Sequence, residues 1–248
     1  MDTILRPLVP QYAKLGKYDG ATLTVIIPCY ERGVKLNRTL WSIMQTADMP
    51  YRILISEEKQ SVAKNRNAAL AKVDTDLIAQ MDDDVILPPF WMSKMAAILE
   101  RDGVGVCAVR MTSPDGTPQN DLANLKPGTI VDCTPPGTLF MYDRTVVDGC
   151  EFDEEYIGSQ WEDTDFMMQV KKKGLLTVAS GDVWILHDQS SVEEGSKMKE
   201  LSASPYEANK ALFIHKWHGG PAPKTAKAPR PKAAKTRKAK AKKAGGIR

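Results

Sequence analysis

The first half of the chain alternates short apolar runs with segments of helical periodicity, and this alternation restricts the possible folds strongly. Residues 22–28 (TLTVIIP) are nearly all apolar or β-branched, as in a strand that is covered on both faces. The next segment, 34–46, places Leu36, Leu40 and Ile43 at helical spacing. The same pattern predicts strands at 51–56, 77–81 and 104–109 and helices at 61–71 and 90–100. This order predicts an α/β fold with a mostly parallel sheet and right-handed crossovers.

The second half of the chain is less regular. Residues 111–136 are rich in Pro, Gly, Asp and Asn, and an irregular segment of this length in a compact domain is commonly a lid or a binding loop. Beyond it the pattern predicts strands at 137–142, 175–178 and 183–186, a helix at 162–173 and a closing helix at 210–217.

Length and composition favour a single domain with extensions. The 248 residues can bury a core, and we expect an N-terminal extension at 1–20, a domain at 21–218 and a tail at 219–248. There is no run of about 18 apolar residues and no signal-peptide pattern, which favours a cytoplasmic location. The four cysteines lie far apart, so their spacing indicates neither a zinc site nor a disulfide framework.

The C-terminal tail differs in charge from the rest of the chain. Residues 221–248 contain eight Lys, three Arg and no acid, which leaves 23 basic against 31 acidic residues in 1–220, a net charge of −8. The tail is almost free of large apolar side chains, so we expect it to be disordered. Such a segment attracts polyanions and suggests a nucleic-acid tether; the alternative is a solubilising or generic anionic-surface arm. It has no aromatic residue on which bases could stack.

Three consecutive aspartates, Asp82, Asp83 and Asp84, close the expected strand at 77–81. A buried strand that ends in carboxylates delivers hard oxygen ligands to the carboxyl edge of an open α/β sheet, where such sheets bind their ligands. The cluster therefore predicts a site for a divalent metal and a phosphate. The alternative is an acidic turn before the helix at 90–100, since Asp is common in loops.

Several motifs follow one another in an order that resembles a known family. They are TVIIPCYER from Thr24, the acids Glu57 and Glu58, KNRNAAL with Arg66, LIAQMDDDVILPPFW with the aspartates, and WEDTDFMMQVKKKG from Trp161. Together they resemble a GT-A type nucleotide-sugar glycosyltransferase of the inverting family 2, with an acidic motif like that of the galactosyltransferase branch. The resemblance covers 22–191 and implies a nucleotide-binding half at 21–110 and an acceptor half at 111–195. We expect the domain to end in a C-terminal helical segment at 196–218.

The resemblance implies a nucleotide-sugar donor, with a UDP-sugar favoured, and Mn²⁺ or Mg²⁺ as the metal. Asp84 would bind the metal, Asp82 the metal or the donor ribose, and His187 would complete the metal shell. Imidazole suits Mn²⁺ better than Mg²⁺. A structural histidine is the alternative, in which case Asp188 would replace His187. The residues implied in donor binding are Pro28, Tyr30, Arg32, Glu57, Glu58, Arg66, Asp82 and Asp83.

Two of these donor assignments have open alternatives. Arg66 would pair with the donor diphosphate or lock the Asp82 loop, because guanidinium matches planar anions, but a solvated helical arginine has the same sequence pattern. Glu57 or Glu58 would accept a hydrogen bond from the nucleobase or ribose. The family more often has Asp at this place, and a pair of surface acids is the alternative.

The resemblance also assigns the acceptor side of the site. Inverting transfer needs a base that removes the proton of the acceptor hydroxyl, and Asp163 is the candidate. Glu162 would bind the acceptor or orient the site, and Trp161 would form an apolar wall for the acceptor. The alternative is that these acids only favour the positive end of a helix.

The sequence leaves the acceptor and two rival functions open. The acceptor would be a modified DNA base, given the basic tail, or else a protein or a glycan. A nucleotidyltransferase is one rival, although residues 28–33 lack the Gly-rich loop typical of that class. The other rival is a catalytically inert GT-A domain that serves as a nucleic-acid-binding module.

Overall fold

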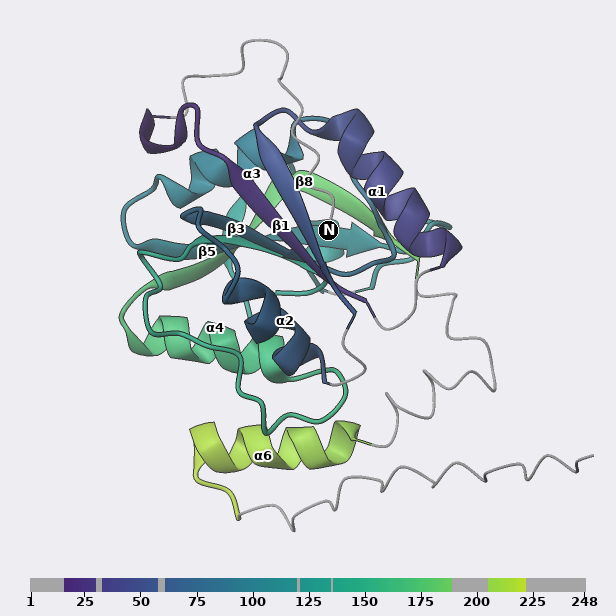
Figure 1. Ribbon diagram of the computed structural model, residues 1–248. Coiled ribbons are helices and arrows are strands. Elements are labelled where there is room, and N and C mark those ends of the chain that lie inside the picture. The colour runs from purple at the N-terminus through teal and green to yellow at the C-terminus, as the bar shows by residue number, and fades with distance from the viewer. Residues whose placement is uncertain are drawn as a thin grey trace, which may run out of the picture.

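The computed structural model describes residues 16–29, 33–57, 61–119, 121–134, 136–188 and 205–221. They form one mixed sheet between layers of helices (Figure 1). The strands are β1 (Leu23–Pro28), β2 (Tyr51–Ser56), β3 (Leu77–Met81), β4 (Val85–Ile86), β5 (Val104–Thr112), β6 (Ile130–Asp132), β7 (Leu139–Asp143) and β8 (Leu176–His187). The helices are α1 (Val34–Thr46), α2 (Val62–Leu70), α3 (Trp91–Leu99), α4 (Glu162–Lys172) and α6 (Tyr206–His218), with short 3₁₀ turns η1 (Gly16–Tyr18) and η2 (Asp121–Asn124).

The strand order is β2-β1-β3-β7-β5-β8-β4, and β6 pairs with β8. Parallel ladders join β1 to β2, β1 to β3 and β5 to β8, whereas β7 runs antiparallel between β3 and β5. Strands β1, β2, β3, β5 and β8 therefore point one way, and β4, β6 and β7 point the other way. The predicted α/β class is confirmed, with a sheet that is mixed although most of its strands share one direction.

Helices cover both faces of the sheet (Figure 1). Val25 packs in a core with residues of α1 and α3, such as Trp91, whereas the neighbouring Ile26 faces the other core with residues of α2 and α4, such as Phe166. Successive strand residues point to opposite faces, which explains why the run at 22–28 is almost wholly apolar. Among the described helices, none is both long and apolar enough to cross a membrane.

Several sequence-based boundaries in the second half of the chain are wrong. The expected strands at 175–178 and 183–186 are one strand, β8, in which the pairing with β5 jumps from Val109↔Ser180 to Arg110↔Trp184. Gly181 lies in this bulge, and its backbone N–H donates to the carbonyl of Thr129 at 2.9 Å. The segment at 111–136, expected to be irregular, contains η2 and β6.

The carboxyl ends of the first three strands meet at one edge of the sheet. Pro28 of β1 pairs with Ser56 of β2, and β3 runs parallel to β1 on its other side. The acidic turn follows at once, and the backbone N–H of Asp82 donates to the carbonyl of Thr138 at 2.9 Å.

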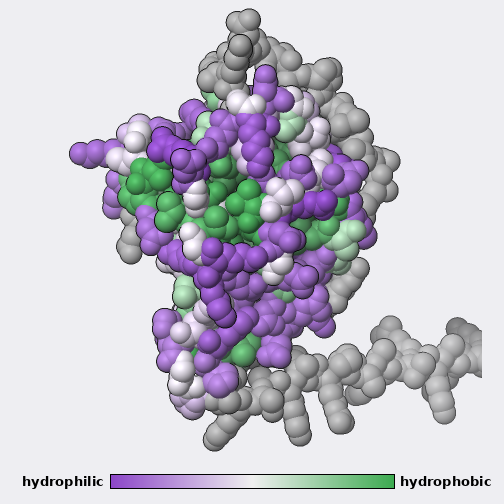
Figure 2. Space-filling model, turned by 90° about the vertical axis from the view of Figure 1, so that its left-hand side faces the viewer, coloured by the Kyte–Doolittle hydropathy of each residue, from purple (hydrophilic) through white to green (hydrophobic). Residues whose placement is uncertain are grey.

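Figure 2 views the side on which η1 lies in Figure 1, where β1 begins. Apolar residues gather across the middle of that face, surrounded by hydrophilic ones. The acidic turn belongs to the opposite end of the parallel strands.

Candidate active site

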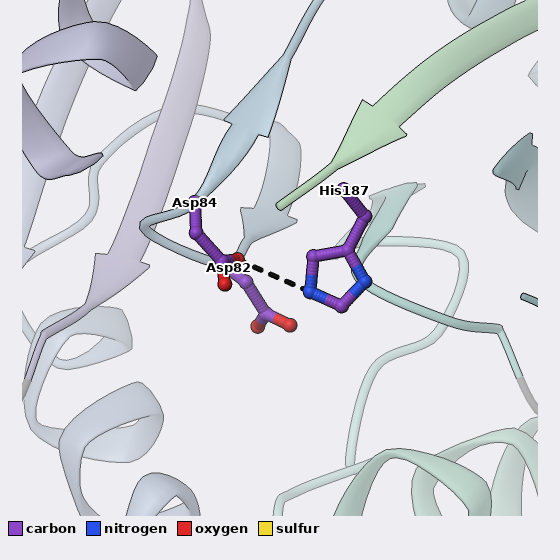
Figure 3. A group of neighbouring side chains, drawn as sticks. All are labelled: Asp82, Asp84 and His187. Carbon is purple, nitrogen blue, oxygen red and sulfur yellow. Dashed lines mark ion pairs between the residues drawn. The ribbon is translucent and has the colours of Figure 1, made fainter. Parts of the chain in front are cut away.

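A cluster of possible metal ligands forms where β4 pairs with the end of β8. The antiparallel pair Val85↔His187 places Asp84 next to His187. One ligand atom each from Asp82, Asp84 and His187 lies within 4.8 Å of the others. Figure 3 shows these side chains turned toward one another, with Nε2 of His187 3.1 Å from Oδ1 of Asp84. Two carboxylates and an imidazole are a donor set that suits Mn²⁺.

Gln119 fixes the orientation of the His187 ring. Its Oε1 lies 2.7 Å from Nδ1 of His187, while its Nε2 donates to the His187 carbonyl at 2.9 Å and to Oγ of Ser113 at 2.7 Å. Because an amide oxygen only accepts, Nδ1 carries a proton, and in the neutral ring Nε2 presents its lone pair to the aspartates. The sequence did not single out Gln119, although it lies in the segment predicted to contain a binding loop.

Burial and charge act against each other in this cluster. Desolvation raises the pKa of Asp82 to about 7, against the lowering influence of Arg66 and His187, although 35% of the side chain stays open to solvent. Burial also raises the pKa of Asp83. Desolvation lowers the pKa of His187, whereas the hydrogen bond to Asp84 and the negative charge of Asp84 raise it. The raising effects are larger together, so the pKa of His187 lies above its usual value. A group of carboxylates crowded in this way favours a bound cation.

Arg66 joins the aspartate cluster to the start of α4. The side chain is only 3% exposed, with NH2 3.5 Å from Asp82 Oδ1 and NH1 3.4 Å from Glu162 Oε1. Its guanidinium also lies over the rings of Phe140 and Phe152, at 5.5 and 5.1 Å from their centroids. The alternative of a solvated helical arginine is therefore wrong, and Arg66 contacts the Asp82 turn.

The two acids at the start of α4 differ in exposure. Glu162 is 4% exposed and faces Arg66, whereas Asp163 is half-buried and accepts the backbone N–H of Thr164 at 2.6 Å. Desolvation, together with the charge of Asp163, raises the pKa of Glu162 to about 7. Burial also raises the pKa of Asp163, against the influence of Arg66 and Thr164. Of the pair, Asp163 has the better access to a substrate.

The turn before α4 is strained. Gln160 and Trp161 have φ angles of 78° and 76°, in the left-handed region, which costs about 1–2 kcal/mol for each non-glycine residue. The ring of Trp161 packs against α6, with its centroid 5.0 Å from that of Phe213 and 5.9 Å from that of Tyr206. The structure thus gives Trp161 a packing role, and its contact with an acceptor stays a prediction.

Three further predicted residues that the structure describes lie around the same edge. Pro28 is buried at the end of β1, and Glu57 is exposed directly after β2. Asp188 forms ion pairs with Lys35 at 3.2 Å and Arg38 at 3.1 Å, so α1 engages its carboxylate while His187 faces the cluster. The predicted donor contacts Tyr30, Arg32 and Glu58 lie outside the described residues.

A separate hollow of about 790 Å³ opens between α2, α4 and α6. None of the predicted site residues within the described part of the chain lines it. Its lining includes Asn67, Phe152, Lys172, Lys216 and Trp217.

The fold and this arrangement of acids define a GT-A type glycosyltransferase domain. The model of the family described as "Glycosyl transferase family 2" matches residues 45–187, more than half of the chain. The chain belongs to glycosyl transferase family 2.

Solved structures share the fold. TarS 1–349 of S. aureus in complex with UDP-GlcNAc superposes with a TM-score of 0.58 at 14% identity, over 78% of this chain and 65% of that one. GalNAc-T7 with UDP, GalNAc and Mn²⁺ gives a TM-score of 0.56 at 12% identity, over 78% of this chain and 50% of that one. The uncharacterized protein y4gI of Sinorhizobium fredii is 31% identical over 78 residues, which are 31% of this chain and 9% of that protein. The chain thus spans less than two thirds of each of these proteins.

Proposed function

We propose that this protein is a metal-dependent glycosyltransferase that moves a sugar from a UDP-sugar to an acceptor hydroxyl with inversion. The observation that carries the proposal is the double contact of Arg66, which unites the cluster of Asp82, Asp84 and His187 with the acids of α4 in one site. The UDP complexes of the two solved neighbours support the choice of donor.

In this proposal Asp84 and His187 hold the metal together with Asp82. Mn²⁺ is favoured over Mg²⁺ because of the imidazole ligand. The bound ion supplies positive charge against the diphosphate leaving group. Gln119 keeps Nε2 of His187 turned toward the ion. In the same proposal the nucleotide-sugar donor is bound by Pro28, Tyr30, Arg32, Glu57, Glu58 and Asp83.

Asp163 acts as the general base. Its carboxylate takes the proton of the acceptor hydroxyl while the acceptor oxygen bonds to the anomeric carbon and the bond from that carbon to the diphosphate oxygen breaks. The acceptor enters opposite the leaving group, so the configuration inverts. Glu162, held by Arg66, orients the acceptor, and Trp161 borders it.

The acceptor is the least constrained part of the proposal. The basic tail, which motivates a DNA acceptor, lies outside the described residues. The hollow beside α6 is lined by three lysines and by the acids Glu151, Asp153 and Glu154, so its own charge does not select a polyanion. An acceptor screen therefore compares DNA that carries hydroxylated bases with glycans and peptides.

The first experiment tests donor and metal binding. Thermal denaturation is followed with UDP-, GDP- and dTDP-sugars, with and without Mn²⁺. A UDP-sugar with Mn²⁺ should raise the melting temperature, because a ligand that binds only the folded state stabilises it. Asp84→Asn should abolish the shift, and Asp102→Asn, at an exposed turn, should keep it. Gln119→Ala should weaken Mn²⁺ binding about 10-fold through the loosened histidine.

The second experiment tests turnover. Release of UDP is measured with an acceptor or with water, and Asp163→Asn should lower it about 100-fold or more while the donor shift persists. Full turnover in Asp163→Asn would remove this residue as the base. A donor shift without turnover in the wild type favours the inert binding module. No shift with any donor, in a folded protein, would refute the proposed function.

A further inference from the structure

A buried asparagine of α6 is bonded to the backbone of the turn that precedes α4. Asn209 is 2% exposed, and its Oδ1 accepts the backbone N–H of Ile157 at 3.0 Å. Its Nδ2 faces three carbonyls, those of Ile157 at 2.8 Å, Ser159 at 3.2 Å and Gln160 at 3.1 Å. One amide side chain of α6 therefore contacts the backbone of Ile157, Ser159 and Gln160.

This turn determines where α4 begins. Gln160 and Trp161 both adopt left-handed backbone angles, and the carbonyl of Trp161 accepts the N–H of Asp165 at 2.8 Å as part of the first helical turn. Glu162 and Asp163 follow immediately, so the direction of their side chains depends on the strained turn. Strained conformations persist only where surrounding contacts enforce them.

A different set of contacts anchors the other end of α6. Asp165, 0% exposed, accepts Nζ of Lys216 at 2.9 Å, Nε1 of Trp217 at 2.7 Å and the hydroxyl of Tyr156 at 3.2 Å. The bonds from Lys216 and Trp217 hold the C-terminal half of α6 on α4. Because neither side chain bonds to the 157–160 backbone, they can be altered separately from Asn209.

We propose that Asn209 is a positioning residue for the Glu162–Asp163 pair, holding the 157–161 turn in the geometry that aims Asp163 at the acceptor. The inference rests on the proposed function of Asp163 as the base. A displacement of about 1 Å at a reacting group costs about 100-fold in rate, so a loosened turn affects turnover more than donor binding.

The amide group is required for this contact. Asn supplies an acceptor and two donor hydrogens in one plane, and this matches one N–H and several carbonyls. Asp at this position would still accept the N–H of Ile157 but would direct negative charge at the carbonyls. Ala would leave the carbonyls of the turn without their partner.

The test compares Asn209→Ala with Trp217→Phe, a matched variant that removes one hydrogen bond between α6 and Asp165 but leaves the turn untouched. Three quantities are measured: UDP release, the Kd for UDP with Mn²⁺, and hydrogen exchange of the amides at 157–165. Asn209→Ala should lower kcat about 10-fold or more with an unchanged Kd and should speed exchange in the turn. Trp217→Phe should lower the melting temperature without these two effects.

Either of two results would contradict the role of Asn209. If kcat in the two variants falls only in proportion to their loss of thermal stability, Asn209 is a packing residue and the inference is wrong. If Asn209→Ala does not fold, Asn209→Asp replaces it, with the same expected loss of kcat. If the wild type shows no turnover with any sugar donor, the proposed function fails, and the exchange measurement still decides whether Asn209 holds the turn. Unchanged exchange at 157–165 would overturn the inference on its own.

Discussion

At the scale of single residues, the site depends on the buried guanidinium of Arg66, which lies among crowded carboxylates. Burial raises the pKa values of Asp82, Glu162 and Asp163, and the charge of Arg66 opposes this rise at each of them. The protonation state of these acids therefore depends on desolvation and neighbouring carboxylates, which raise their pKa values, and on Arg66, which lowers all three.

The raised pKa values predict a pH dependence of turnover. Asp163 must be ionised to act as the base, and burial raises its pKa above the usual value of an aspartate, so kcat/KM should rise with pH through that raised pKa and then level off. Glu162→Gln removes a neighbouring negative charge, which lowers the pKa of Asp163 and should shift the profile to lower pH. The measurement is UDP release between pH 5 and 8.5 at saturating Mn²⁺. A profile that moves to higher pH in this variant would contradict the assignment.

Sequence reasoning reached the charged residues and missed the amides. Three aspartates after an apolar run and a histidine at a strand end carry a recognisable pattern, and the structure brings Asp82, Asp84 and His187 together. Gln119 and Asn209 act through partners 68 and about 50 residues away in the chain, and an amide side chain carries no sequence signal of such a contact. The periodicity of apolar residues also does not predict that Arg66 is buried.

At the scale of elements, the helices and the early strands follow their apolar periodicity closely. The bulge in β8 was missed because Ser180, Gly181 and Asp182 have the composition of a turn, and local sequence does not show whether a strand continues through it. The early start of α6, at Tyr206, was missed because the residues before Lys210 show little amphipathic pattern.

The bulge predicts a sharp sensitivity at Gly181. A Cβ added there would lie 1.9 Å from the backbone oxygen of Lys126, which cannot move aside as a flexible side chain would. Gly181→Ala should therefore lower the free energy of unfolding by about 3 kcal/mol, measured by urea denaturation. Gly174→Ala is the control for backbone strain without a clash, since its φ of +80° disfavours alanine but its Cβ would meet nothing within 4 Å. We expect that variant to lose only about 1 kcal/mol. Equal losses in the two variants would show that the bulge relaxes.

At the scale of the whole molecule, charge is segregated along the chain. Residues 1–220 carry a net charge of −8, whereas residues 221–248 carry eleven basic residues and no acid. Because the net negative charge of residues 1–220 disfavours polyanions, we expect any affinity for them to reside in the tail.

Removal of residues 222–248 tests whether binding of the sugar donor and binding of DNA reside in different parts of the chain. We expect the shortened protein to keep its Mn²⁺-dependent binding of UDP and to lose binding to duplex DNA. In the full chain, DNA affinity should fall about 1,000-fold or more between about 50 and 200 mM salt, because each neutralised phosphate releases a counterion. Fluorescence anisotropy with labelled DNA measures both proteins. DNA binding that survives the truncation would place the interaction on the body.

The position of β1 has a consequence for how this domain can be shortened. The family match begins at residue 45, yet β1 lies between β2 and β3 in the sheet, and α6, beyond the other border at 187, holds the start of α4. A chain cut at these two borders would lose β1 and α6, and β2, at the edge of the sheet, would lose its partner strand. A shortened protein that keeps the site therefore has to extend beyond residues 45–187 at both ends, to include β1 and α6.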